Sequence, residues 1–234
     1  MAKRIFAAAA LLGLVGLAAT ANATPVPGPD QLTEGVYYGN GNGGTNFNWT
    51  ITNGTLELGL QGLIRTVGPI TPDGTVYQVS TGTAANGSQL WGFAYSAFDS
   101  AGFDNVALSI SILDVGKNST QSFQPLLVPD NGAIDGTPGD TSSDCLHSSA
   151  AACASPTGIQ NAENPSFSFV DAGYNPWVAD SYVITLTATD PSGNTQLGQV
   201  SITVNAVPEP VSLSLLGAGL VGMGVVRRRK KSAA

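Results

Sequence analysis

A β-hairpin pattern runs through Phe47-Asn48-Trp49-Thr50-Ile51-Thr52, then Asn53-Gly54, then Thr55-Leu56-Glu57-Leu58-Gly59-Leu60. An Asn-Gly pair supplies the two positive φ angles that a type I′ turn needs, and it is the strongest short-range sign of a two-residue hairpin. The flanking threonines suit an extended backbone because their side chains are branched at Cβ. We therefore predict two antiparallel strands here, joined at Asn53-Gly54.

Further strands are expected along the chain, because short apolar runs alternate with small polar residues and end at Gly, Pro, Asn or Asp. They cover residues 63–67, 75–79, 90–98, 106–113, 182–189 and 200–204. Turns are predicted at Pro72-Asp73-Gly74 and at Asp190-Pro191-Ser192-Gly193-Asn194. The aromatic stretch 90–98 is interpreted as a strand buried on both faces, with a short helix as the alternative.

The pattern as a whole predicts an all-β fold. No window between residues 24 and 206 sustains a helical period, and many short strands favour an antiparallel β-sandwich, immunoglobulin-like or related. The hairpin from Tyr182 to Val204 resembles the closing strands of bacterial immunoglobulin-like or cadherin-like modules. Residues 125–165 carry little periodicity, so they form either a long loop or a boundary between two units of the 24–206 domain.

Residues 1–23 have the organisation of a secretory signal peptide. Lys3 and Arg4 precede the apolar run 5–19, and Ala21-Asn22-Ala23 fits the small-x-small cleavage pattern. We predict a signal helix that the general secretory translocon recognises and that is removed after Ala23. The alternative is a retained N-terminal anchor.

An uncharged apolar run extends from Val211 to Val226. Five basic residues follow it: Arg227, Arg228, Arg229, Lys230 and Lys231. A helix over the run would be about 24 Å long, and snorkelling basic side chains let it cross a hydrocarbon core of about 30 Å. The positive-inside rule then keeps the basic tail in the cytoplasm and the preceding domain outside. The alternative is a buried core helix with a basic tail.

Pro208-Glu209-Pro210 directly precede this run, and two prolines hold the backbone extended there. This order of motif, short Gly-rich span and arginine cluster resembles the PEP-CTERM sorting signal of Gram-negative bacteria, over about residues 207–231. The resemblance implies that 207–234 is a sorting domain and that an exosortase recognises Pro208, Glu209 and Pro210. It also implies a transient stay in the inner membrane, followed by arrival at the cell surface or outside the cell.

The charge is distributed very unevenly along the chain. Seven of the nine basic residues lie in the two terminal segments, whereas all sixteen acidic residues lie between Asp30 and Glu209. Only Arg65 and Lys117 remain as cations between Thr24 and Pro210, so this part carries about fourteen net negative charges. Such a chain is repelled by nucleic acid, and we exclude a nucleic-acid partner.

Few residues suggest bound metals or covalent cross-links. Cys145 and Cys153 predict a local disulfide in an oxidising compartment, with a metal site beside His147 as the alternative. A Gly-rich loop with Asp130, Asp135 and Asp140 is the best candidate for calcium, and ordinary turns are the alternative. No other cofactor is expected.

No motif arranges residues for catalysis. His147 is the one histidine, and no pattern pairs two carboxylates for glycoside hydrolysis. The tryptophans Trp49, Trp91 and Trp177 are core residues or sugar-stacking platforms, and Trp177 is expected to be the most exposed because it follows Asn175-Pro176.

We therefore expect a non-catalytic surface or matrix protein. The family resemblance implies a structural or adhesive role in an exopolysaccharide or biofilm setting. Two other functions stay open: a polysaccharide-binding module, with or without calcium, and a secreted hydrolase.

Overall fold

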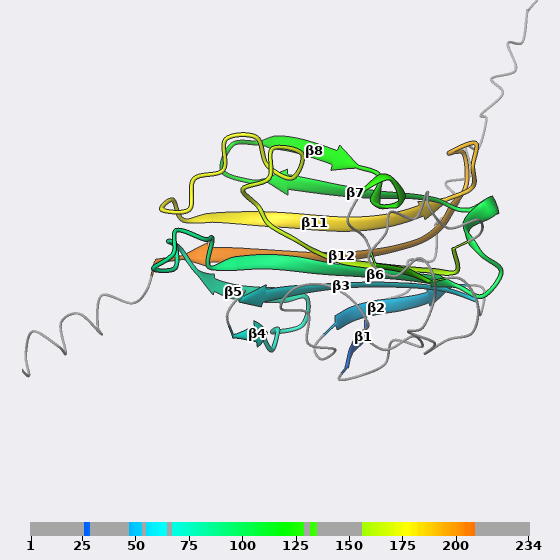
Figure 1. The fold of residues 1–234 in the computed structure, drawn as a ribbon, viewed down its shortest axis with the longest axis horizontal. Coiled ribbons are helices and arrows are strands. Elements are labelled where there is room, and N and C mark those ends of the chain that lie inside the picture. The colour runs from blue at the N-terminus through cyan, green and yellow to red at the C-terminus, as the bar shows by residue number, and fades with distance from the viewer. Residues whose placement is uncertain are drawn as a thin grey trace, which may run out of the picture.

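The computed structural model describes residues 26–28, 47–52, 55–64, 67–128, 132–134 and 156–208. These residues form two β-sheets that pack face to face (Figure 1). Their only helical turns are two short 3-10 segments, Phe103–Asn105 (η1) and Pro125–Leu127 (η2). The prediction of an all-β fold is confirmed. The signal helix and the C-terminal membrane helix both lie outside the described residues.

The larger sheet has seven strands in the order β1-β2-β3-β6-β10-β9, with β4 paired to β3, and all of its pairs are antiparallel. Its strands are Val26–Gly28 (β1), Phe47–Thr52 (β2), Leu56–Ile64 (β3), Gly68–Pro69 (β4), Trp91–Asp99 (β6), Gly132–Ile134 (β9) and Gly158–Glu163 (β10). Every described residue of β6 is buried, so the prediction of a strand covered on both faces is confirmed and the helix alternative is wrong.

The smaller sheet has five strands in the order β5-β12-β11-β7-β8. They are Val76–Ser80 (β5), Ala107–Asp114 (β7), Ser119–Phe123 (β8), Asp180–Thr189 (β11) and Gln196–Val207 (β12). The last strand inserts between β11, to which it is antiparallel, and β5, to which it is parallel. The sandwich is therefore not purely antiparallel, which corrects that part of the prediction.

The core lies between the two sheets. Alternate residues of β11 and β12, among them Ile184, Leu186 and Ile202, face the inner side of the larger sheet and are buried. The Tyr77 ring of β5 lies directly over Gly62 of β3, and a Cβ atom placed on Gly62 would be 2.7 Å from the Tyr77 Cγ. The two sheets approach so closely at this point that only glycine fits.

The predicted hairpin is present but longer than its sequence suggested. β2 and β3 pair from Asn48–Leu60 to Thr52–Leu56, so residues 53–55 connect them instead of Asn53-Gly54 alone. The second strand continues to Ile64, because Leu63 and Ile64 still pair with β6. The separate strand predicted at 63–67 is therefore wrong. Its first two residues end β3.

Five strands, β1, β4, β8, β9 and β10, were not predicted, because β1 and β4 span only three and two residues and the other three lack an apolar period. β8 reads Ser-Thr-Gln-Ser-Phe and lies at the edge of the smaller sheet, and Phe123 is its one apolar residue packed against the core. β10 contains buried Gln160 and Asn161. β9 occupies 132–134, between two of the aspartates proposed for calcium, so this part of the loop is a strand and not a turn.

Candidate functional site

The chain leaves the sandwich at one end, where the last strand, β12, finishes. The strand register identifies the residues at this end. In the larger sheet, Ile64 pairs with Trp91 and Phe93 with Glu163. In the smaller sheet the pairs are Asp114 with Tyr182, Asp180 with Ala206, and Ser80 with Val207. We call this the exit end (left in Figure 1) and define it by residues 64, 67 and 68, the loops 81–90 and 115–118, residues 171–179, and residues 207–208.

Strand β12 ends at Val207, the residue directly before the Pro-Glu-Pro motif. The backbone N–H of Thr81 donates a hydrogen bond of 2.9 Å to the carbonyl oxygen of Val207, the last residue of the strand. Pro208 follows and is exposed. Proline has no N–H to offer to a ladder, so the strand ends there. The first residue of the Pro-Glu-Pro motif therefore adjoins the folded sheet with no linker between them.

A tight turn beside this point presents Trp177. The N–H of Val178 donates to the carbonyl oxygen of Asn175 at 3.2 Å, and the N–H of Trp177 donates to the Asn175 side-chain Oδ1 at 3.1 Å. Pro176 suits the second position of such a turn because its φ angle is fixed. Trp177 is 69 % exposed, whereas Trp91 is 1 % exposed. The prediction that Trp177 is an exposed tryptophan is confirmed.

The Trp177 turn is joined to the last strand through one glycine. The N–H of Gly82 donates to the carbonyl oxygen of Pro176, and Gly82 adopts a φ of +112°. A Cβ on Gly82 would lie 3.2 Å from the Cζ3 atom of Trp177, so the indole rests against this residue. Gly82 directly follows Thr81, which binds Val207. Trp177 is therefore fixed next to the exit of the chain.

A three-residue ionic network lies below the same loops. Lys117 Nζ is 2.6 Å from Asp114 Oδ2 and 2.9 Å from Asp171 Oδ2. Both aspartates are buried, and the lysine side chain is 37 % exposed. Burial alone would raise the pKa of Asp114, but hydrogen bonds from the Lys117 side chain and backbone outweigh it, and the pKa is lowered. The network ties the β7–β8 turn to the loop 164–179.

The pKa of Lys117 moves in the opposite direction. Burial tends to lower it, but the hydrogen bonds and negative charges of Asp114 and Asp171 dominate, and the pKa is raised. A neighbouring carboxylate, Asp180, is held separately by the backbone N–H groups of Gly116 at 2.8 Å and Ser181 at 2.7 Å. Among the described residues, Lys117, Asp114 and Asp171 thus pair with one another, and Asp180 accepts hydrogen bonds from the backbone.

Three aromatic rings pack beneath this network. The Trp91 ring centroid is 5.1 Å from that of Tyr182 and 6.1 Å from that of Tyr174, and the two tyrosines are 6.1 Å apart. Burial raises the pKa of Tyr174 to about 12, and burial also raises the pKa of Tyr182.

Because of these raised pKa values, we expect the free energy of unfolding to fall in alkali. In the unfolded chain a tyrosine ionises near pH 10, while folded Tyr174 keeps its proton to about pH 12. The folded state therefore holds more protons in this range, and its stability is intact below about pH 10 and falls as the pH rises towards 12. Lys117, with its raised pKa, acts in the same direction. Unfolding by urea at a series of pH values, followed together with phenolate absorbance, checks this. If these tyrosines ionise in the folded protein at a pH well below the pH at which its stability falls, the prediction is contradicted.

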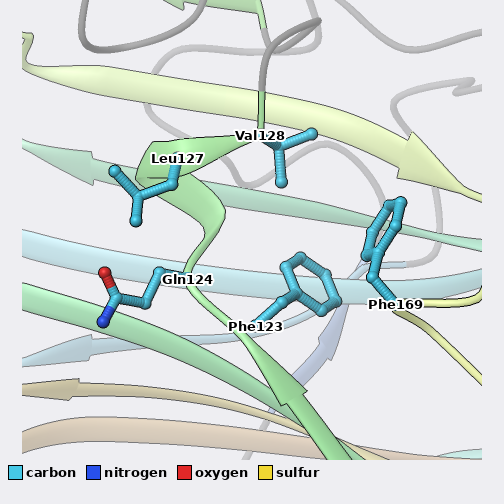
Figure 2. Close-up of a pocket in the computed structure, with 5 residues that line it drawn as sticks. All are labelled: Phe123, Gln124, Leu127, Val128 and Phe169. Carbon is cyan, nitrogen blue, oxygen red and sulfur yellow. The ribbon is translucent and has the colours of Figure 1, made fainter.

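A second surface feature is an apolar hollow of about 200 Å³ beside the end of β8. Figure 2 shows its lining, formed by Phe123, Gln124, Leu127, Val128 and Phe169. The Phe123 and Phe169 rings meet edge to face with centroids 5.2 Å apart, and Phe167 stacks on Phe169 at 5.6 Å. Phe169 remains 40 % exposed. This hollow was not predicted from the sequence, where its one signal is the Phe-Ser-Phe alternation of 167–169.

Most of the site residues predicted from the sequence lie outside the described residues. They are Ala21 and Ala23, Asp130, Asp135 and Asp140, Cys145 and Cys153, Glu209 and Pro210, the span Val211 to Val226, and Arg227, Arg228, Arg229, Lys230 and Lys231. Of the sorting motif, the structure places Pro208. Within the described ranges, no group of three or more His, Cys, Asp or Glu side chains is placed to hold a metal ion.

The same restriction applies to the membrane segment. The part of the chain that the structure describes contains no helix long and apolar enough to cross a membrane.

Comparison with known proteins identifies one region. Residues 206–230 match the family model of the PEP-CTERM protein-sorting motif. No curated protein and no solved structure matches the chain significantly. The chain thus carries a sorting motif of the kind that exosortases process, which makes it an exported protein with a transient C-terminal membrane anchor. The match begins at Ala206, inside β12, so the motif and the folded sandwich are contiguous.

Proposed function

We propose that this protein is a non-catalytic, structural or adhesive component of the exopolysaccharide matrix at the cell surface. The general secretory translocon exports it, and an exosortase processes it at Pro208-Glu209-Pro210. The observation that carries the proposal is the sorting motif, which directly follows a folded, exported sandwich. A protein destined for the outside of the cell without a recognisable catalytic motif fits a role in holding material together.

The charge of the exported part supports this setting. About fourteen net negative charges between Thr24 and Pro210 keep such a chain soluble and prevent it from condensing on anionic surfaces. A matrix component must remain dispersed until it meets its polymer. Compositions of this kind favour an extracellular, hydrated environment over a densely packed assembly.

A second candidate function is specific binding of a polysaccharide chain. The observation that favours it is the hollow beside β8, where Phe169 lies between an edge-to-face and a stacked neighbour and still exposes part of its face. Flat aromatic faces are the surfaces on which sugar rings stack. With its amide turned to suit its neighbours, Gln121 of β8 donates to the Ser168 carbonyl and accepts from the Ala172 N–H, which fixes the loop that carries Phe169.

The test uses the form of the protein recovered from outside the cells and the exopolysaccharide of the same cells. We expect the protein to sediment with the polysaccharide and to leave its chain length unchanged. If the hollow binds the sugar, Phe169→Ser weakens the association roughly fivefold, which corresponds to about 1 kcal/mol for one lost ring contact. The matched control is Val67→Ser, which removes an apolar side chain that is 78 % exposed and remote from the hollow.

The outcomes separate the candidates. Association that is equal for the wild type and Phe169→Ser supports a matrix role without this binding site. Shortening of the polysaccharide would show a hydrolase and contradict the non-catalytic proposal. No association at all would also overturn it.

A further inference from the structure

We propose that the exit end of the sandwich rests on the outer surface of the inner membrane while the C-terminal segment is still attached, with the Trp177 indole inserted at the lipid–water interface. The inference concerns the anchored state before processing. It does not depend on any polysaccharide, so its test is independent of the test of the proposed function.

The first support is where the exposed apolar side chains lie. Eight large apolar side chains are exposed among the described residues, and five of them belong to the exit end: Val67, Val115, Trp177, Val178 and Val207. Val115 and Val178 are each about half exposed, and Val67 and Trp177 more than two-thirds. Single exposed apolar residues are ordinary, but their concentration on one end indicates a surface that meets something apolar.

The second support is the near absence of charge at this end. The loops 81–90, 115–118 and 164–179 contain one acidic residue, Asp171, and one basic residue, Lys117, and these two are paired. The connection between Ile64 and Val67 adds a second basic residue, Arg65, which lies outside the described residues. Asp171 is 3 % exposed, and Asp180 at the start of β11 is held by backbone N–H groups. By contrast, Asp104 is exposed at the opposite end of the sandwich. A strongly acidic domain would be repelled by anionic lipid through most of its surface, but not through the exit end.

The third support is the length of the connection. The apolar run begins at Val211, three residues after Pro208, and an extended chain of that length reaches at most about 11 Å. Pro208 adjoins Val207, which is bound to Thr81, and Gly82 beside it contacts Trp177. Any arrangement that places Val211 in the bilayer therefore brings Trp177 close to the membrane surface. The occupant of this face is thus a lipid surface and not a partner protein.

Trp177 has the chemistry that such a position requires. Tryptophan is enriched at membrane–water interfaces because its ring is apolar and its N–H is polar. The Asn175–Val178 turn holds the residue by two hydrogen bonds, so little conformational freedom is lost when it enters the lipid. Val178 and Val207 beside it add apolar surface without adding charge.

The experiment places the full-length chain in vesicles of phosphatidylethanolamine and phosphatidylglycerol whose acyl chains are brominated near the glycerol end. Bromine quenches tryptophan fluorescence at short range. The chain has three tryptophans, none of them in the terminal apolar segments, and Trp91 is buried in the core. We expect roughly a third of the emission to be quenched relative to unbrominated vesicles, because one tryptophan of three lies in the interface.

Two matched variants identify the quenched residue. Trp177→Phe is expected to abolish the quenching, whereas Trp49→Phe is expected to keep it. Because Trp177 is largely exposed, its replacement has little effect on folding, and near-ultraviolet circular dichroism verifies this for both variants. Emission that is the same in both kinds of vesicle overturns the proposal. Quenching that persists in Trp177→Phe overturns it as well, because another tryptophan would then be the one in contact with lipid.

Discussion

Replacement of Lys117 by methionine is expected to lower the free energy of unfolding by about 2–3 kcal/mol. Loss of one partner from a buried ion pair typically costs about 3–5 kcal/mol, because the remaining charge is left uncompensated. The value here is smaller because the Lys117 side chain is 37 % exposed and water screens part of the charge. The substitution leaves Asp114 and Asp171 buried, both negative and without their shared cation. Equilibrium unfolding in urea measures the effect.

Two further variants show whether charge is the cause. Lys117→Met combined with Asp114→Asn and Asp171→Asn removes the uncompensated carboxylates and is expected to recover part of the loss. The acid dependence provides a second check. The pKa of Asp114 is lowered in the folded protein, so its contribution is present above about pH 4 and is lost as the pH falls through the folded value. This acid-side loss is expected to shrink in Lys117→Met. A stability within about 0.5 kcal/mol of the wild type would contradict a structural role for the network.

Replacement of both Pro208 and Pro210 by alanine is expected to leave most of the protein unprocessed in the inner membrane. The family match assigns these residues to the sorting motif. The structure adds a physical reason for the effect at Pro208. Val207 still pairs with Ser80, and proline ends the ladder because it has no N–H. Alanine restores that N–H, so the strand can lengthen and draw the motif towards the sheet, away from the enzyme.

Intact mass measurement of the protein from the membrane and from outside the cells checks this prediction. The wild type recovered outside is expected to begin near Thr24 and to end near Pro208. The double variant is expected to retain residues 211–231 and to remain with the membrane. The matched control is Val207→Thr, which keeps the strand and the motif. Equal masses and equal distribution for the wild type and the double variant would show that the prolines are not needed. A wild-type chain that keeps 211–231 outside would contradict processing itself.

The sequence predicted those strands whose residues alternate. The apolar face of β11 and β12 was evident because every second residue from 182 to 186 and from 200 to 204 is Val, Ile, Leu or Tyr, and these residues are buried. Trp177 could be predicted to be exposed because Asn-Pro directly precedes it in the sequence. In each case the information is local, since a period of two or a turn pair can be seen within a few residues.

The remaining features depend on distant pairings that no local pattern contains. Alternation in β3 indicates which face is apolar, but it cannot show that the opposite face, with Glu57 and Gln61, is buried too. The Lys117–Asp171 pair joins residues 54 positions apart. The parallel insertion of β12 next to β5 likewise depends on the whole topology. For the candidate site, the sequence predicted the motif but not the apolar, uncharged end of the sandwich beside it.

The place of β12 in the smaller sheet has a mechanical consequence. The strand lies between two neighbours, and the chain continues from its C-terminal end towards the membrane anchor. A pull on the anchored end acts along the strand, whereas the hydrogen bonds to β11 and β5 run across it. All of these hydrogen bonds therefore bear the load together in shear, and they do not break one after another from one end of the strand. A domain tethered in this way resists a pull on its C-terminal end until the tether is cut.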